Sequence, residues 1–229
     1  MYTPAPFKID DPAELRAFMR RHSFATIVTH DGTAPHATHM PVLLEENRGP
    51  HGTLVSHMAR ANPQWRHFEN GQEVLVTFTG PHAYISPAWY AAEPNVPTWN
   101  YTAVHAYGRP QPISDPDRFS QMLEDLVEFY ERGRTHRWHG QIPADYRDKL
   151  MKAIVGVEIG ITRLEGKYKL GQNRPGDMPG VMAALGASAD QTDRETAAMM
   201  AGVAGGLPRK PSADRPAGGT SGGPADNQA

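Results

Sequence analysis

Short runs of alternating apolar and polar residues, separated by glycine, proline and asparagine, recur along most of this chain. Residues 23–29 and 34–44 are two such runs, and the dipeptide Asp31-Gly32 between them is typical of a β-hairpin turn. Similar apolar or β-branched runs cover 52–58, 73–79, 83–85, 100–107 and 153–164. The pattern therefore predicts six or seven strands.

Helical signals are fewer and lie between or beside these runs. Asp10 or Asp11 can cap a helix that has Pro12 at its first position and ends near residue 21. A second helix follows the cap-like segment 114–117 and carries one apolar stripe, while 143–150 and 177–185 are shorter candidates. Many closely spaced strands with few helices favour a mainly β, mostly antiparallel barrel with peripheral helices, an α+β fold.

The aromatic residues divide the chain into two parts. Every Trp, Phe and Tyr precedes residue 169, whereas residues 205–229 hold six Gly and four Pro. Ordering such a segment costs more conformational entropy than its burial returns. We expect one folded domain over 1–186 and a low-complexity, disordered tail over 187–229, in which Thr192 and Glu195 frame a short helix that adds little to the core.

Composition excludes several classes of protein. The 23 basic and 25 acidic residues leave a net charge of −2, which gives no overall basic field for a polyanion. The chain has no cysteine, so disulfides, thiolate metal sites and cysteine nucleophiles are excluded. No apolar run approaches the ~20 residues of a membrane-spanning helix, and we expect a cytoplasmic protein.

A possible anion site lies where the run at 52–58 gives way to a helix. Asn62 is a good helix cap, Pro63 fits the first turn, and Arg60 stands just before them. Free backbone N–H groups, the positive end of the helix dipole and a guanidinium together suit a phosphate. The same spacing also fits a surface arginine followed by an ordinary cap.

Two further stretches contain groups that suit a phosphorylated heterocycle. Residues 167–174 (KYKLGQNR) follow the last predicted strand, and alternation places Lys167 and Lys169 on one side. A solvated loop is the alternative there. Residues 80–101 combine two Trp and three Tyr with several prolines, so they form either a stiff cover for a flat ring or the plug of a barrel end.

The histidines do not form a convincing metal site. His36 and His39 are three residues apart, and on a strand such residues face opposite sides of the sheet. His57 and His105 suit ring contact or packing better than metal ligation. We therefore predict no metal, and no spacing typical of a hydrolase is present.

Five stretches together match a known pattern. They are Met1-Tyr2-x-Pro4-x-x-Phe7, 52–65 (GTLVSHMARANPQW), 84–90 (YISPAWY), 96–105 (VPTWNYTAVH) and 165–174 (EGKYKLGQNR). They resemble the PaiB-type family of FMN-binding negative transcriptional regulators, over residues 1 to about 185. One departure is Gly171, which stands where the family pattern has Ser.

The resemblance implies a split β-barrel, usually a homodimer with FMN at or near the subunit interface. It strengthens Arg60 and Asn62 as a phosphate clamp, with Lys167 or Lys169 as a second cation and the ring lying toward Trp99. The full set of expected cofactor-binding residues is His57, Arg60, Asn62, Trp99, Asn100, Tyr101, Lys167, Lys169, Gln172 and Arg174.

Three functions remain open at this stage. The first is a flavin-responsive repressor that contacts DNA or a DNA-binding partner, although the best local basic patch, residues 132–137, fits a solvated loop better. The second is a split-barrel flavoenzyme, an FMN-dependent oxidoreductase or flavin reductase, which needs no protein nucleophile. A haem-binding relative with His36, His57 or His105 on iron is a third alternative.

Overall fold

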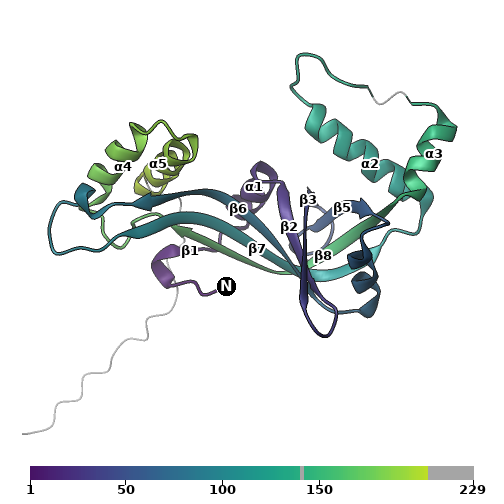
Figure 1. Ribbon diagram of the computed structural model, residues 1–229, viewed down its shortest axis with the longest axis horizontal. Helices are drawn as coiled ribbons and strands as arrows, with labels where there is room; N and C mark the ends of the chain where they lie inside the picture. Colours follow the sequence, from purple (N-terminus) through teal and green to yellow (C-terminus); the bar gives the residue numbers. More distant parts are fainter. Residues whose placement is uncertain (140–141, 206–229) are drawn as a thin grey trace, which may run out of the picture.

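An eight-stranded antiparallel sheet forms the centre of the computed structural model, which describes residues 1–139 and 142–205 (Figure 1). The strands are β1 (Lys8–Ile9), β2 (Phe24–His30), β3 (Pro35–Pro41), β4 (Leu43–Glu45), β5 (Thr53–Ala59), β6 (Val74–Ile85), β7 (Thr98–Pro112) and β8 (Ile154–Lys169). Their order is β3-β2-β6-β7-β8-β5-β4, with β1 added beside β8. The sheet curls without closing, as the predicted split barrel requires.

The α-helices lie at the two ends of this sheet and near its middle (Figure 1). The α-helices are α1 (Pro12–Arg21), α2 (Pro116–Glu131), α3 (Ala144–Lys152), α4 (Met178–Gly186) and α5 (Gln191–Ala204), and the 3₁₀ helices are η1 (Ala5–Phe7), η2 (Pro63–Asn70) and η3 (Pro87–Trp89). Helices α4 and α5 sit over one end of β6 and β7, while α2 and α3 project from the other end. None of the helices in the described ranges is long and apolar enough to cross a bilayer.

Local sequence signals account for where the helices begin. The Asp11 carboxylate accepts a hydrogen bond from Ala13 N at 3.0 Å, and Asp115 caps α2 in the same way through Asp117 N at 3.1 Å. Both caps satisfy N–H groups that lack partners within the helix. The helices predicted from Pro12 to about residue 21, after the segment 114–117, over 143–150 and over 177–185 are confirmed, as is the hairpin of β2 and β3.

Strand β8 is longer than the sequence pattern indicates, and this changes the setting of the basic cluster. The alternation predicts an end at residue 164, but pairing with β7 continues to Lys169, which lies opposite Tyr101. Lys167 and Lys169 therefore stand on the last strand, not in a loop after it. The predicted runs at 73–79 and 83–85 are likewise one strand, β6, with a register shift between Thr79 and His82.

The main core lies between the curled sheet, α1 and the α4–α5 pair. Phe18 of α1 is 1% exposed and packs against Tyr168 of β8, with ring centroids 5.4 Å apart. Leu185 of α4 and Met200 of α5 belong to the same cluster. A second, smaller cluster joins Phe119, Met122 and Leu126 of α2 to strands β4 and β5.

Helix α5 corrects the expected domain boundary. The helix predicted within 187–203 exists, but the expectation that it adds little to the core is wrong, since Thr196 and Met200 are buried. The folded part therefore extends past residue 186 to the end of α5. The predicted disorder of the glycine-rich tail concerns residues 206–229, which lie outside the described residues.

Candidate functional site

The expected cofactor-binding residues fall into two groups at opposite ends of β8. His57, Arg60 and Asn62 lie beside its first residues, where Ala59 pairs with Ile154. The others lie beside its last residues or in the turn that follows: Trp99, Asn100, Tyr101, Lys167, Lys169, Gln172 and Arg174. Fifteen residue steps separate Ile154 from Lys169, roughly 50 Å for a straight strand. One chain thus does not bring both groups to one phosphate.

The Arg60 end is built largely from backbone contacts. The Arg60 guanidinium donates to the carbonyl oxygens of Lys152 at 2.9 Å and Ile154 at 3.0 Å, and it lies 5.8 Å from the Trp65 ring. Nη1 has no hydrogen-bond acceptor among the described residues, and the side chain is exposed. This nitrogen is therefore available to a ligand. Arg60 is therefore a fixed, solvent-facing cation.

Asn62 caps the helix that follows, as the sequence predicts. Its Oδ1 accepts from Gln64 N at 3.0 Å, and its Nδ2 donates to Thr38 Oγ1 at 2.9 Å. The helix is the 3₁₀ helix η2, with Pro63 in its first turn. Because both ends of the Asn62 amide are occupied, its contribution is to orient the chain beside Arg60.

The histidines make contacts of different kinds, and the rings of His36 and His67 meet edge-on at 4.9 Å. His36 pairs with Asp31 and His39 with Thr26, each at 2.8 Å, and no group of three potential metal ligands occurs in the described part of the chain. His57 and His105 each bury an Nδ1 that has no hydrogen-bond partner there. Desolvation lowers the pKa of both imidazoles, so they are neutral at pH 7.

An exposed aromatic face lies at the far end of the sheet. We use this name for Tyr2, Tyr84, Trp99 and Tyr101, of which Tyr2 is 84% and Trp99 is 54% exposed. Tyr84 and Trp99 are cross-strand partners whose rings meet edge-on at 6.0 Å. Lys167, 7% exposed, lies 5.6 Å from the Tyr2 ring and 5.0 Å from the Tyr101 ring. Its Nζ donates to Tyr2 O at 3.1 Å.

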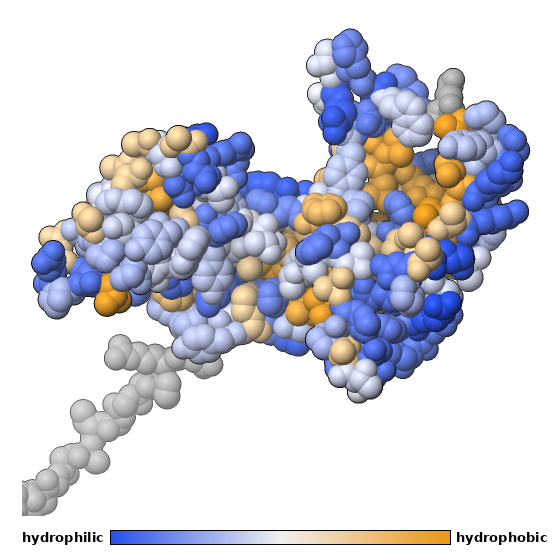
Figure 2. All heavy atoms as spheres, in the orientation of Figure 1, coloured by the Kyte–Doolittle hydropathy of each residue, from blue (hydrophilic) through white to orange (hydrophobic). Residues whose placement is uncertain are grey.

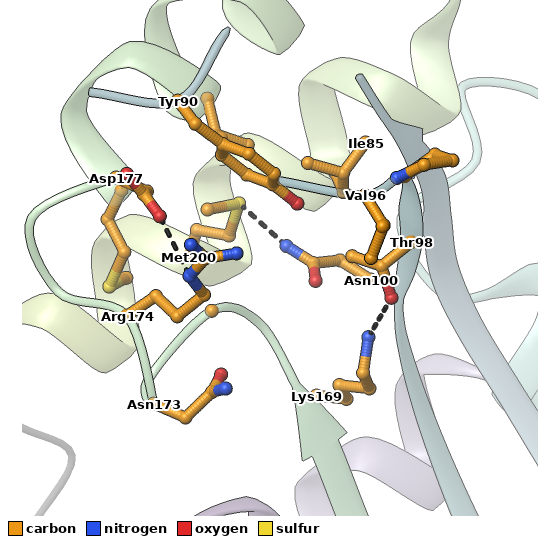
Figure 3. A pocket seen from close by; sticks show the side chains of 14 residues that line it. Ile85, Tyr90, Val96, Thr98, Asn100, Lys169, Asn173, Arg174, Asp177 and Met200 are labelled. Carbon is orange, nitrogen blue, oxygen red and sulfur yellow. Dashed lines mark hydrogen bonds and ion pairs between the residues drawn. The ribbon is translucent and has the colours of Figure 1, made fainter. Parts of the chain in front are cut away.

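Asn100 points away from this aromatic face. It lies between Trp99 and Tyr101 on β7, so strand alternation places its side chain on the opposite face, where it is 3% exposed. Within a single chain, Asn100 therefore does not share the aromatic face with Trp99 and Tyr101. Asn100 instead faces a pocket under α4 and α5 (Figure 3).

That pocket has a volume of about 230 Å³ and contains two of the expected cations. Lys169 Nζ donates to Thr98 Oγ1 at 2.6 Å and to Trp99 O at 2.5 Å, and burial lowers its pKa, with neighbouring Lys167 adding to the effect. Arg174 Nε lies 3.0 Å from Asp177, and the guanidinium is 4.8 Å from the Tyr90 ring.

Gln172 has a role inside the turn. Its Nε2 donates to Tyr168 O at 2.6 Å, and its Oε1 accepts from Leu170 N at 2.8 Å. The amide thus joins the end of β8 to the turn and is not part of the pocket wall. Its expected contact with a cofactor stays a prediction.

Several pocket residues were not singled out by the sequence. Tyr90 belongs to the aromatic stretch, but Met178, Val181 and Met200 come from α4 and α5, whose sequence shows no strong amphipathic stripe. The adjacent Met199 and Met200 after the Thr192–Glu195 cap were the available signal. The contact of Met200 with β7 joins residues that are a hundred positions apart in the sequence, since its partner is Asn100.

Comparisons with known proteins agree on a flavin-binding family. Residues 1–163 match the model of a family described as "Putative FMN-binding domain". The chain is 42% identical over 176 residues to protease synthase and sporulation protein PAI 2 of Bacillus subtilis, an alignment that covers 76% of this chain and 83% of that protein.

Solved structures of the same fold include two flavoproteins. The flavocytochrome Anf3 from Azotobacter vinelandii superposes with a TM-score of 0.56 at 17% identity, over 71% of this chain and 69% of that one. The FAD and heme binding protein from Mycobacterium smegmatis gives a TM-score of 0.55 at 18% identity, over 71% and 73% of the two chains. These likenesses confirm the split-barrel fold.

Proposed function

Because the chain belongs to the PaiB-type family of FMN-binding split-barrel proteins, we propose that it is a flavin-responsive negative regulator of transcription. FMN is its cofactor. The regulatory role is supported by the 42% identity to a Bacillus protein named for protease synthesis and sporulation. The structural observation that carries the proposal is the exposed aromatic face beside Lys167, a surface that a bound flavin would cover.

The side chains at the two ends of β8 suit different parts of FMN. Arg60 is an exposed cation with one guanidinium nitrogen available, which suits the phosphate. Trp99 and Tyr101 offer apolar ring surface, and Lys167 between Tyr101 and Tyr2 supplies positive charge beside it. An aromatic surface next to a cation matches an electron-poor, flat isoalloxazine.

We propose that a second copy of the chain completes this site. Since Arg60 and Trp99 lie at opposite ends of β8, a twofold pair can place the Arg60 end of one protomer against the aromatic face of its partner. Figure 2 shows hydrophobic side chains gathered in a hollow beside α2. A groove beside α2 is lined by Leu43 and Phe129 and bordered by Arg132 and Glu128, and such mixed charges suit a self-complementary interface.

Within such a site the chain binds and orients the cofactor. FMN supplies the redox chemistry when bound, and the protein controls its exposure to water. Arg60 fixes the phosphate end, and Trp99 shields one side of the ring. A change in flavin occupancy would alter the same surface that meets the partner protomer, which links the cofactor to assembly.

DNA contact needs a surface other than the loop after α2. Arg132 and Arg137 both pair with Glu128, and Arg134 pairs with Glu131, so the positive charge of this patch is largely neutralised. These pairs favour the solvated-loop interpretation. We therefore expect DNA recognition through the assembled dimer or through a second protein.

Flavin titration followed by DNA retention tests the proposal. Protein as isolated is titrated with FMN, FAD and haem, and FMN should bind at micromolar concentrations with quenching of its fluorescence. Trp99→Ala should reduce the quenching, because the indole is the most exposed large ring of β7. Promoter fragments from the protein's own genome should then be retained in a salt-sensitive and flavin-dependent manner. Retention of promoter fragments that does not change with flavin contradicts the proposal.

A flavoenzyme is the second candidate, favoured by the likeness to a flavocytochrome and to a FAD and heme binding protein. The unpartnered, neutral Nδ1 atoms of His57 and His105 are the groups that could serve a haem or a substrate. Reduction of bound flavin by NAD(P)H, seen as loss of its absorbance at a rate compatible with turnover, would support this candidate if no DNA is retained. A Soret band that survives replacement of His36, His57 and His105 would exclude those residues as haem ligands.

A further inference from the structure

The pocket under α4 and α5 has the features of a second ligand site. Its apolar floor is formed by Ile85 of β6 and by Met178, Val181 and Met200 of the two helices. Figure 3 shows Ile85, Met200 and Tyr90 around a space into which the Arg174 side chain also points. Asn100 in this site faces away from the aromatic face, whereas Lys169 stands on β8 opposite Tyr101 of that face.

The polar groups of the pocket carry a net positive charge. Lys169 and Arg174 contribute two cations, and Asp177 contributes one carboxylate. That carboxylate is already satisfied by Arg174 at 3.0 Å and by Ala91 N at 2.9 Å. A ligand with a single negative charge would neutralise the remaining cation.

Asn100 supplies the observation that points to a ligand. Its side chain is 3% exposed, and Nδ2 has only the sulfur of Met200, at 3.5 Å, as its partner. Oδ1 accepts no hydrogen bond from the described residues and faces the pocket in Figure 3. A buried amide without proper partners costs free energy, so a ligand that donates a hydrogen bond to Oδ1 is favoured.

Gly171 leaves the space that such a ligand would use. Its φ of +88° lies in the left-handed region, and a Cβ there would be 3.4 Å from Met178 Cγ, 3.7 Å from Met200 Cε and 4.0 Å from Asn100 Nδ2. Any side chain at this position would extend into the pocket beside Asn100. Glycine therefore keeps the pocket open next to its unsatisfied amide.

We propose that this pocket binds a small monocarboxylate that has an apolar body and a hydrogen-bond donor. The carboxylate lies between Lys169 and Arg174, the body packs on Met178 and Met200, and the donor meets Asn100 Oδ1. The volume of about 230 Å³ lies below the ~300–1,000 Å³ of pockets for drug-sized ligands, so the ligand is smaller than FMN. The proposal does not depend on the regulatory function.

Calorimetry with 4-hydroxybenzoate and its neutral analogue 4-hydroxybenzamide tests this inference on the full chain. We expect one 4-hydroxybenzoate per chain and at least tenfold weaker binding of the amide. Arg174→Gln, which removes a positive charge, and Asn100→Leu, which removes the acceptor Oδ1 but keeps the size of the side chain, should each weaken 4-hydroxybenzoate at least tenfold. Arg147→Gln is the matched control, since Arg147 is an exposed arginine of α3 outside the pocket, and it should bind normally.

If Arg174→Gln fails to fold, Gly171→Ala is the second variant that tests the pocket. The added methyl group should reduce 4-hydroxybenzoate binding while leaving FMN affinity unchanged. The proposal is overturned if neither probe gives heat, if both bind equally, or if FMN displaces 4-hydroxybenzoate. It is also overturned if Asn100→Leu lowers FMN affinity as much as it lowers 4-hydroxybenzoate affinity, because the pocket then belongs to the flavin.

Discussion

Glu158 of β8 joins three elements through two arginines. Arg48 donates to both of its carboxylate oxygens at 2.8 Å, and Arg118 of α2 donates at 2.6 Å. The hydrogen bond from Arg48 is the largest cause that lowers the pKa of Glu158 to about 2. Glu158→Gln should therefore reduce the free energy of unfolding at pH 7 by roughly 1–2 kcal/mol, a value discounted for partial solvent screening.

The pH dependence of stability provides the measurement. Because the folded-state pKa of Glu158 lies below its ordinary value of 4.5, its contribution is complete above that value and is lost as the pH falls toward 2. Urea unfolding of the wild type should show this loss, and Glu158→Gln should show a flatter profile. Glu124→Gln, an exposed residue of α2, is the control. Equal profiles in wild type and Glu158→Gln would contradict the assignment.

Arg60 is the residue on which flavin affinity should depend most. Arg60→Ala should weaken FMN about ten- to a hundredfold, or roughly 1.5–3 kcal/mol, if its guanidinium makes a charge-assisted bond to the phosphate. Arg66→Ala is the matched control, because Arg66 also stacks on Trp65, at 5.2 Å. Fluorescence titration measures both. Arg60 also donates to two backbone carbonyl oxygens, so melting curves must show that Arg60→Ala is folded. If the FMN affinity of the folded variant is unchanged, Arg60 is not part of the site.

At the scale of elements, α5 belongs to the folded unit. Met200 is 1% exposed within the main core, so Met200→Ala should cost about 2–5 kcal/mol in free energy of unfolding. Met199→Ala is a suitable control because Met199 is only partly buried. Deletion of residues 206–229, by contrast, should leave the melting temperature and flavin content nearly unchanged. Urea unfolding and thermal melts compare the three proteins, and equal losses for the two methionines would contradict this role of α5.

Capping residues and local hydrophobic patterns predicted most helices and strands. The features that they did not predict depend on contacts between residues far apart in the sequence. Asp11, Asp115 and Asn62 all cap helices where the sequence indicates, because a cap depends on residues two or three positions apart. The extension of β8 to Lys169 depends on pairing with β7, about 68 positions earlier along the chain. The burial of Met200 against Asn100 likewise has no local signature.

The candidate site was harder to predict than the fold. The residue types were chosen for their chemistry, yet alternation along β7 separates Asn100 from Trp99 and Tyr101. That separation follows from strand geometry once the strand is known to cover Thr98–Pro112. The distance between Arg60 and Lys169 follows only from the antiparallel pairing of β5 and β7 with β8.

At the scale of the whole molecule, the proposed two-chain site makes a stoichiometric prediction. A heterodimer of one Arg60→Ala chain and one Trp99→Ala chain has one site with both side chains intact and one site with neither. Co-expressed, differently tagged chains should therefore hold one tight FMN per dimer, whereas each mutant homodimer holds none at the same concentration. Absorbance of the purified heterodimer at flavin wavelengths measures this ratio. If the heterodimer has two weak FMN sites, or no tight site, each chain binds FMN alone.

The course of β8, which has one register shift opposite Tyr107 and Gly108, limits how proteins of this design can vary in length. Inserting one residue between Ile154 and Lys169 would turn Lys167 and Lys169 to the other side of the sheet and disturb the register with its neighbours. Inserting two would keep their direction and move the ends about 7 Å further apart. Functional variants of this strand should therefore differ by even numbers of residues, and a natural change by one should coincide with a compensating bulge.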